Sequence, residues 1–218
     1  MTAFLALILL LAVATAFPEV QVSFTVSEFT IGSDLNAVAL FGGGAIAVGR
    51  AGTVAIAYAD GERLLERPVD KNLLDVSCDG QMCMAVGERG AAIIIDVSRR
   101  VLKPVRLSDD LRIIGAHGGR FYIASSKQVM EYSPESGISA VYGIEALGIL
   151  SADRLYALSR DGVYYVEGGE LKRLASGSYS LLAWFNGSLH ALSKGGLYRI
   201  PDNVMVMEGS YDGLASCG

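Results

Sequence analysis

The sequence predicts an all-β protein built from five consecutive repeats of four antiparallel strands. Turn residues of the Gly, Asn and Asp type recur at intervals of about 34–39 residues. Short runs rich in Val, Ile, Leu, Tyr and Ala lie between these turns and have the length and composition of strands. Within each repeat the first run is the most apolar and the last is the most polar. This period and this gradient are typical of the blades of a β-propeller, and a β-sandwich is the alternative.

Each repeat contains three hairpin turns, where Gly, Asn and Asp tolerate the positive φ that such turns need. The first turn is marked by Gly43, Gly80, Gly119, Asp153 and Gly187. The innermost strands are expected at Ala37–Phe41, Leu73–Val76, Leu111–Gly115, Ala146–Leu150 and Leu181–Phe185. The outermost strands are expected at Arg63–Arg67, Val101–Arg106, Gly137–Val141, Glu170–Leu174 and Val204–Glu208.

The two ends of the chain predict an incomplete sixth blade that both termini build together. Val20–Val26 has the pattern of a third strand, and Phe29–Asp34 leads into the first repeat as an outermost strand would. At the other end, Leu214–Cys217 repeats the pattern of Asp75–Cys78, which belongs to the innermost strand of the second repeat. A ring of five blades with trimmed ends is the alternative.

The N-terminus predicts a signal peptide over residues 1–16. Residues 3–17 are apolar apart from Thr15, a run shorter than the roughly 20 residues that a membrane span needs. Ala14-Thr15-Ala16 has the small-x-small pattern of a cleavage site before Phe17. No Lys or Arg precedes the apolar run, so a retained membrane anchor made of residues 1–17 stays open. Residues 17–218 are then a single propeller domain that is secreted or held at the cell surface.

The cysteines agree with export. Cys78 and Cys83 flank a predicted turn, and residues that face each other across antiparallel strands lie within disulfide range. An exported protein meets conditions that allow the bond. Two reduced thiols or a metal pair are the alternatives, although no second Cys/His pair completes a tetrahedral site. Cys217 has no predicted partner.

The block from Val76 to Gly90 resembles the repeats of BNR/sortilin-like and photosystem-assembly-factor-like propellers, which run through an inner strand and a turn into Ala-Val-Gly-x-x-Gly. Gly87 and Gly90 match that pattern, and Gly49 and Gly52 match it less strictly. The resemblance implies a scaffold for protein contact, although some such propellers are glycosidases. The Ser-x-Asp-x-Gly-x-x-Trp box of BNR glycosidases is absent from the sequence.

Residues that could carry catalysis are sparse. The two histidines, His117 and His190, occupy different places in their repeats, one in a first-turn loop and one on a second strand. The sequence contains no Gly-x-Ser-x-Gly elbow and no P-loop. The innermost strands offer almost no polar side chain except Asp75. We therefore expect a non-catalytic binding module, or a subunit of a surface or membrane assembly, without cofactor or metal. A carbohydrate-active hydrolase or lyase outside the cytoplasm stays open as the alternative.

The second turns carry a cation in every repeat, and in a propeller these turns share one end with the blade-to-blade loops. The cations are Arg50, Arg89, Lys127, Arg160 and Lys194. Acids occupy the adjoining loops at Asp34, Asp70, Asp109, Asp110 and Glu145. The pattern predicts a basic ring that binds an anionic ligand or partner. Ordinary solvated turn residues, balanced by those acids, are the alternative.

The partner that these features suggest is a protein or a glycan. A net charge of −5 disfavours a general nucleic-acid binder. Asn186-Gly187-Ser188 is an N-glycosylation sequon, and Asn-Gly is also a favoured hairpin turn. An incomplete sixth blade would leave strand edges that could self-associate, so a self-assembling structural protein of the envelope is a further alternative.

Overall fold

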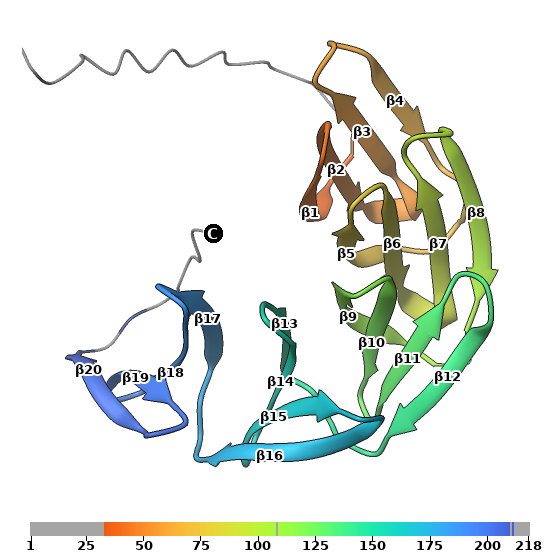
Figure 1. The fold of residues 1–218 in the computed structure, drawn as a ribbon. Coiled ribbons are helices and arrows are strands. Elements are labelled where there is room, and N and C mark those ends of the chain that lie inside the picture. The colour runs from red at the N-terminus through yellow and green to blue at the C-terminus, as the bar shows by residue number, and fades with distance from the viewer. Residues whose placement is uncertain (1–32, 108, 210, 212–218) are drawn as a thin grey trace, which may run out of the picture. The chain divides into compact units, whose positions relative to one another are not determined.

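The computed structural model describes residues 33–107, 109–209 and 211. Twenty strands form five antiparallel sheets of four, and within every sheet the strands follow chain order (Figure 1). This arrangement confirms the predicted all-β class and the five repeats. The predicted sixth blade, the signal peptide and Cys217 lie outside the described residues.

The five sheets are called blades 1 to 5. Blade 1 contains β1 (Leu35–Phe41), β2 (Gly44–Gly49), β3 (Val54–Tyr58) and β4 (Arg63–Glu66). Blade 2 contains β5 (Leu73–Asp79), β6 (Met82–Gly87), β7 (Ala91–Asp96) and β8 (Val101–Arg106). Blade 3 contains β9 (Leu111–His117), β10 (Arg120–Ser125), β11 (Val129–Ser133) and β12 (Gly137–Tyr142). Blade 4 contains β13 (Gly148–Ser151), β14 (Leu155–Ser159), β15 (Gly162–Glu167) and β16 (Glu170–Ser176). Blade 5 contains β17 (Leu181–Phe185), β18 (Ser188–Ser193), β19 (Gly196–Ile200) and β20 (Val204–Glu208).

The first hairpins are tighter than the sequence suggests. In blade 3, His117 pairs with Arg120 across a turn of only Gly118 and Gly119, both at positive φ. His117 therefore ends β9, and its predicted place in a loop is wrong. In blade 4 the inner strand begins at Gly148, two residues later than Ala146, where the sequence predicts it.

The core lies between neighbouring blades, because blades 2, 3 and 4 bury apolar side chains on both faces. Blade 1 contributes Ile46 and Ile56 to its contact with blade 2, which contributes Ile93 and Ile95. On the other face of blade 2, Met84 packs with residues of blade 3 in a separate cluster. Comparable clusters join blades 3 and 4 and blades 4 and 5. The innermost strands of successive blades are also in contact (Figure 1).

The middle strands of a blade are more buried than its inner strand, since β5 of blade 2 is mostly half-buried and β1 of blade 1 is mostly exposed, so exposure does not rise steadily outward as the sequence gradient suggests. In blade 2, β6 and β7 are almost fully buried, whereas β8 is mostly exposed. All residues of β20, the last strand of blade 5, are exposed. Within the described part of the chain, no helix is long and apolar enough to cross a membrane.

Candidate binding surface

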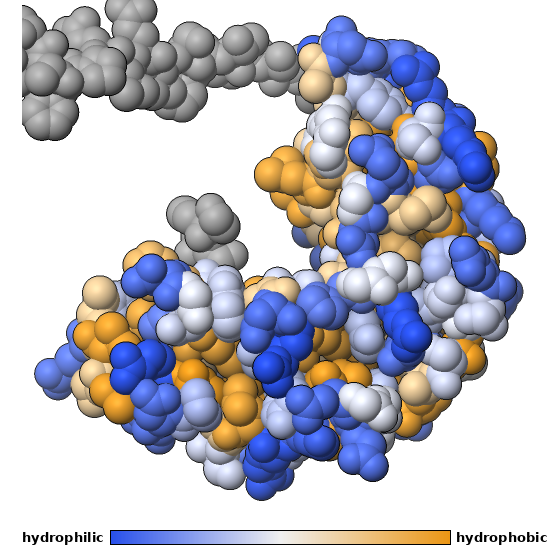
Figure 2. Space-filling model, in the orientation of Figure 1, coloured by the Kyte–Doolittle hydropathy of each residue, from blue (hydrophilic) through white to orange (hydrophobic). Residues whose placement is uncertain are grey.

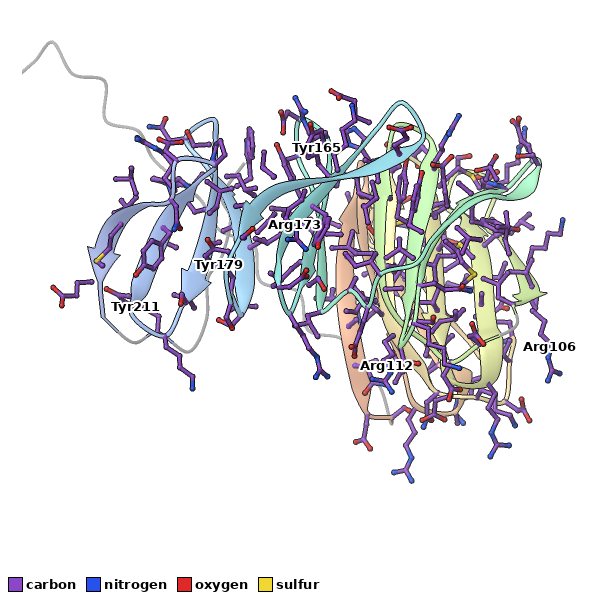
Figure 3. All side chains as sticks on the ribbon, turned by 90° about the horizontal axis from the view of Figure 1, so that it is seen from below. Arg106, Arg112, Tyr165, Arg173, Tyr179 and Tyr211 are labelled. Carbon is purple, nitrogen blue, oxygen red and sulfur yellow. A yellow bond between two sulfur atoms is a disulfide. The ribbon has the colours of Figure 1, made fainter. Side chains whose placement is uncertain are left out.

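The second turns and the blade-to-blade loops lie at one end of the blades, which we call the second-turn end. It comprises residues 33–34, 50–53, 67–72, 88–90, 107, 109–110, 126–128, 143–147, 160–161, 177–180 and 194–195. Arg106 and Arg112 lie beside these loops at the end of β8 and the start of β9. Figure 3 shows both at the lower side of the molecule, away from Tyr165 at the upper side.

Two members of the predicted basic ring are paired with acids. Arg50 lies 3.4 Å from Asp34, and Arg160 lies 3.5 Å from Glu145. In each case the acid comes from the loop that opens the same blade. The Arg50 and Arg160 side chains are 71% and 75% exposed, so each pair contributes about 0–1 kcal/mol. For these two residues the structure favours the alternative of solvated turn residues balanced by acids.

The ring residues of blades 1 and 2 are not equivalent in structure. Gly49 and Gly87 precede matching three-residue turns, so Arg50 corresponds to Glu88 and Arg89 corresponds to Ala51. Ala51 and Arg89 both have positive φ, at 52° and 55°. A cation recurs in these turns, but its position in the turn differs.

A side chain from the next loop holds each of these two turns. The N–H of Ala51 donates to Asn72 Oδ1 at 3.0 Å, and the N–H of Arg89 donates to Asp110 Oδ1 at 2.5 Å. Because the donor residue has positive φ, its N–H points away from its own turn and needs a partner from outside. The loop residues Asn72 and Asp110 therefore help to order these two turns.

Arg89 lines a pocket of about 280 Å³ that brings three cations together. Lys71 and Arg106 line it with Arg89, and Asp70 is the acid among its lining residues. Lys71 Nζ lies 2.7 Å from Asp70 Oδ2, and this hydrogen bond lowers the pKa of Asp70. The remaining walls are mainly apolar and come from Val69, Ala91, Pro104 and Val105.

The other predicted ring members lie apart from this pocket. Lys194 lines a smaller cavity of about 190 Å³ with Tyr179 and Tyr211. Lys127 is exposed, and its N–H donates to Ser125 Oγ at 3.3 Å. Sequence reasoning missed Lys71 and Arg106, because they belong to a loop and to an outer strand and only the packing of β8 beside the second turn joins them to Arg89.

The opposite end of the blades carries two larger hollows. One, of about 480 Å³ between blades 2 and 3, is lined by Asp79, Asp96, Glu135 and Arg99. Two of its acids are engaged in turns, since Asp79 accepts the Gly119 N–H at 2.6 Å and Asp96 accepts from Ser98 Oγ at 2.6 Å. The Ser98 hydrogen bond lowers the pKa of Asp96. The other hollow, of about 450 Å³, is lined in part by Tyr156 and Trp184, whose rings stack with centroids 6.1 Å apart.

Polar side chains of the innermost strands connect neighbouring blades. Asn36 Nδ2 donates to the Leu73 carbonyl at 2.6 Å, which joins β1 to β5. Asp75 Oδ2 accepts the Ile114 N–H at 2.9 Å, which joins β5 to β9. Burial raises the pKa of Asp75. The sequence singled out Asp75 as a polar exception, and its hydrogen bonds give it a structural role.

The two histidines are also engaged within the fold. His117 Nδ1 lies 3.0 Å from Ser151 Oγ on the next inner strand. His190 is 6% exposed, and its Nδ1 lies 3.2 Å from the Ser188 carbonyl oxygen. The Phe185 ring meets the His190 ring edge-on at 5.8 Å.

The disulfide and the Asn-Gly turn lie on first hairpins. Cys78 and Cys83 pair across the β5–β6 hairpin and form a disulfide, with Cα atoms 4.0 Å apart. Asn186 and Gly187 form the turn between β17 and β18, both at positive φ. The turn interpretation of these two residues is confirmed, and glycosylation of the exposed Asn186 stays a prediction.

No family model and no curated protein sequence matches the chain. Solved structures do. The WD40 β-propeller domain of Doa1 is 12% identical, with a TM-score of 0.62 over 82% of this chain and 70% of that one. The fold is a β-propeller. This result confirms the propeller resemblance at the level of the fold.

Two further propellers match at similar levels. U3-55K is 11% identical, with a TM-score of 0.63 over 79% of this chain. PorZ, a surface component of the type-IX secretion system of Porphyromonas gingivalis, is 15% identical, with a TM-score of 0.63 over 81% of this chain. The match covers 62% of the U3-55K chain and 28% of the PorZ chain, so this chain spans less than two thirds of either. At these identities the likeness concerns the fold alone.

Proposed function

We propose that this chain is an exported, non-catalytic β-propeller that binds an acidic protein partner at its second-turn end. The observation that carries the proposal is the pocket lined by Lys71, Arg89 and Arg106. Its three cations outnumber its single acid, whereas the cations at Arg50 and Arg160 each have an acid beside them.

The chemistry of this pocket suits a carboxylate on an exposed segment of another protein. Guanidinium groups such as those of Arg89 and Arg106 bind a carboxylate with two parallel hydrogen bonds. The apolar stretch from Pro104 to Val105 offers a surface for the aliphatic part of the same side chain. A partner residue of the Glu type, with a charged head on a short apolar stem, would use both.

The inner strands support binding over catalysis. An active site needs several polar groups that converge on one substrate. In this chain Asn36, Asp75 and His117 each bond to the neighbouring blade, as described above. Their hydrogen bonds serve the stacking of blades.

Export rests on the predicted signal peptide together with the Cys78–Cys83 disulfide, a bond that persists in oxidising compartments. PorZ, a fold neighbour, is a component of a bacterial surface. We propose a comparable extracytoplasmic location for this chain.

The test is capture of a partner from the native envelope fraction by the tagged full-length chain, with bound proteins quantified by mass spectrometry. A pocket variant carries Lys71→Glu, Arg89→Glu and Arg106→Glu. A ring variant at the same end carries Arg50→Glu and Arg160→Glu. We expect the pocket variant to capture at least tenfold less partner than the wild type. We expect the ring variant to capture most of the wild-type amount.

A third variant, Arg99→Glu, tests the effect of a charge reversal at the opposite end of the blades. Circular dichroism of all three variants checks that the blades are folded. Equal capture by the pocket variant and the wild type would contradict the proposal. Equal losses in the pocket and ring variants would assign binding to the whole basic ring.

A further inference from the structure

The hollow of about 450 Å³ between blades 4 and 5 has an aromatic wall. Trp184 of β17, the only tryptophan of the chain, lines this hollow and is half-buried. The Tyr156 ring of β14 stacks beside the indole, with the ring planes 25° apart. Figure 2 shows hydrophobic and hydrophilic surface side by side over these two blades. The hollow therefore combines a flat aromatic surface with polar groups around it.

Tyr156 holds the aromatic wall in place. Its side chain is buried, and its hydroxyl donates to Asp153 Oδ1 at 2.7 Å. A buried ring that is also held by its hydroxyl keeps one orientation, and it fixes the indole of Trp184 that stacks on it. An aromatic surface that is ordered before binding loses little conformational entropy when a ligand covers it.

Two arginines, one from each blade, line the same hollow, and both are paired. Arg199 places Nη2 at 2.7 Å and Nε at 3.0 Å from Asp202 Oδ2, and Asp202 also lines the hollow. Arg154 Nε lies 3.4 Å from Asp153 Oδ2, and its guanidinium lies over the Tyr165 ring, which Figure 3 labels at the upper side. The charges of this hollow are therefore balanced, unlike those around Lys71, Arg89 and Arg106.

This combination of groups favours a neutral ligand that is rich in hydroxyl groups. A purely apolar side chain of a protein would remove water from the guanidinium and carboxylate groups without replacing its hydrogen bonds. A sugar ring has an apolar C–H face that fits an indole, and its hydroxyl groups both donate and accept hydrogen bonds. Those hydroxyls match the N–H groups of Arg199 and the carboxylate of Asp202. The volume of the hollow lies within the range of small-molecule sites.

We propose that this hollow binds a neutral sugar unit of a glycan, with the C–H face of the sugar on Trp184 and its hydroxyls toward the Arg199–Asp202 pair. The site is at the end of the blades opposite to the second turns. It shares no lining residue with the pocket of Lys71, Arg89 and Arg106. The inference therefore does not depend on the acidic partner proposed for that pocket.

The test titrates the full-length chain with three neutral hexasaccharides: cellohexaose, maltohexaose and mannohexaose. Because Trp184 is the only tryptophan, intrinsic tryptophan fluorescence reports on this hollow alone. Calorimetry measures the same affinities without the indole. We expect a saturable change in fluorescence with at least one of the three sugars, and the same affinity in the Lys71→Glu, Arg89→Glu, Arg106→Glu variant.

Variants on β17 and β19 locate the binding. Trp184→Ala should weaken binding at least about tenfold by calorimetry, because it removes the aromatic wall. Phe185→Ala is the matched control, since Phe185 is the next residue of β17, is exposed and points to the other face of the blade. It should change the affinity by less than about twofold. Arg199→Gln keeps the indole as a reporter and should weaken binding at least about fivefold, so the test stays valid where Trp184→Ala does not fold.

Three results would overturn the proposal. The first is the absence of saturable binding with all three hexasaccharides. The second is an affinity of Trp184→Ala, or of Arg199→Gln, equal to that of the wild type. The third is binding of N-acetyl-tyrosine amide that depends on Trp184 while no saccharide binds, which would assign the hollow to an aromatic side chain of a protein.

Discussion

The interface between blades 1 and 2 and the outward face of blade 1 differ in exposure far more than in composition. Val76 at the interface is 5% exposed, whereas Val38 in the matching row of blade 1 is 68% exposed. Both lie opposite an alanine of the second strand. The repeat therefore determines which positions are apolar, whereas burial depends on whether a neighbouring blade is present. An apolar row without a neighbour is then evidence for a missing contact.

The largest expected effect concerns an interior interface. Phe121 is 1% exposed between blades 2 and 3. Phe121→Ala should lower the free energy of unfolding by about 3–5 kcal/mol, because it removes a large side chain and leaves a cavity. Val101→Ala, on the exposed outer strand of blade 2, should change it by less than about 0.5 kcal/mol. Urea titration measures both. Similar values for the two variants would show that the interfaces between blades do not hold the fold.

The interface between blades 3 and 4 also holds a buried charge. Glu131 is 3% exposed, and it accepts from the Tyr142 hydroxyl at 3.1 Å and pairs with Arg120. Tyr142→Phe should cost about 1.5–3 kcal/mol, because a buried carboxylate loses a donor. Urea titration at neutral pH measures the loss, and a cost below that of an exposed Tyr→Phe change would contradict it.

The same pair predicts a dependence of stability on pH. Burial and the Glu131 hydrogen bond raise the pKa of Tyr142 to about 12. A pKa above the unfolded value of about 10 stabilises the fold below pH 10, and that contribution is lost as the pH rises toward 12. Burial alone raises the pKa of Glu131, but hydrogen bonds from Ser139 and Tyr142 and the charge of Arg120 outweigh it, so the pKa is lowered. The Glu131 contribution is present at neutral pH and is lost as the pH falls through the acidic range.

Stability curves of the wild type and Tyr142→Phe between pH 7 and pH 12 separate this effect from that of the other tyrosines. The difference in the free energy of unfolding between the two proteins should become smaller as the pH rises above 10. A constant difference across that range would contradict the assignment to Tyr142.

The disulfide distinguishes the first hairpin of blade 2 from that of blade 1, which has no cysteine. Closing so short a loop in the unfolded chain contributes about 2 kcal/mol. The double variant Cys78→Ala, Cys83→Ala should lower the free energy of unfolding by this amount. Reductant should lower the melting temperature of the wild type and leave that of the variant unchanged. Thermal melts with and without dithiothreitol measure the effect. A wild type that melts at the same temperature in reductant would show that the bond adds nothing.

The smallest expected effect is the most informative for the comparison. Val76→Ala should cost about 1–2 kcal/mol, because it removes two buried methyl groups. Val38→Ala, at the matching position of blade 1, should cost less than about 0.5 kcal/mol, because Val38 is 68% exposed. Chemical denaturation of both variants measures the two values. Similar costs for the two variants would show that burial in this row does not depend on a neighbouring blade.

The repeats were predictable from sequence because hairpins need residues that tolerate positive φ, and these recur at Gly43, Gly80 and Gly119. The disulfide was predictable for the same reason, since a tight turn places Cys78 opposite Cys83. Strand ends were less predictable. His117 closes a two-residue turn that the glycines beside it allow, and nothing in its own side chain indicates that it ends β9.

The candidate site was predictable only in part. The cation in the second turn of each repeat led to Arg89. The pocket also needs Lys71 and Arg106, which are distant from Arg89 in sequence. The equivalence of Arg89 with Ala51 follows from the glycines on either side, Gly87 and Gly90. An alignment that matches the cations Arg50 and Arg89 does not show this equivalence. The role of Asp75 depends on a backbone N–H of the next blade, which sequence patterns do not place.

The most direct test of the account compares the accessibility of the matched positions 38 and 76. Val38→Cys and Val76→Cys are each made in a Cys217→Ser background, with the Cys78–Cys83 disulfide intact, and labelled with a thiol reagent under native conditions. We expect the Val76→Cys thiol to react at least about a hundredfold more slowly than the Val38→Cys thiol, because a neighbouring blade covers position 76, whereas position 38 is exposed. Equal labelling rates at the two positions would contradict the dependence of burial on a neighbouring blade.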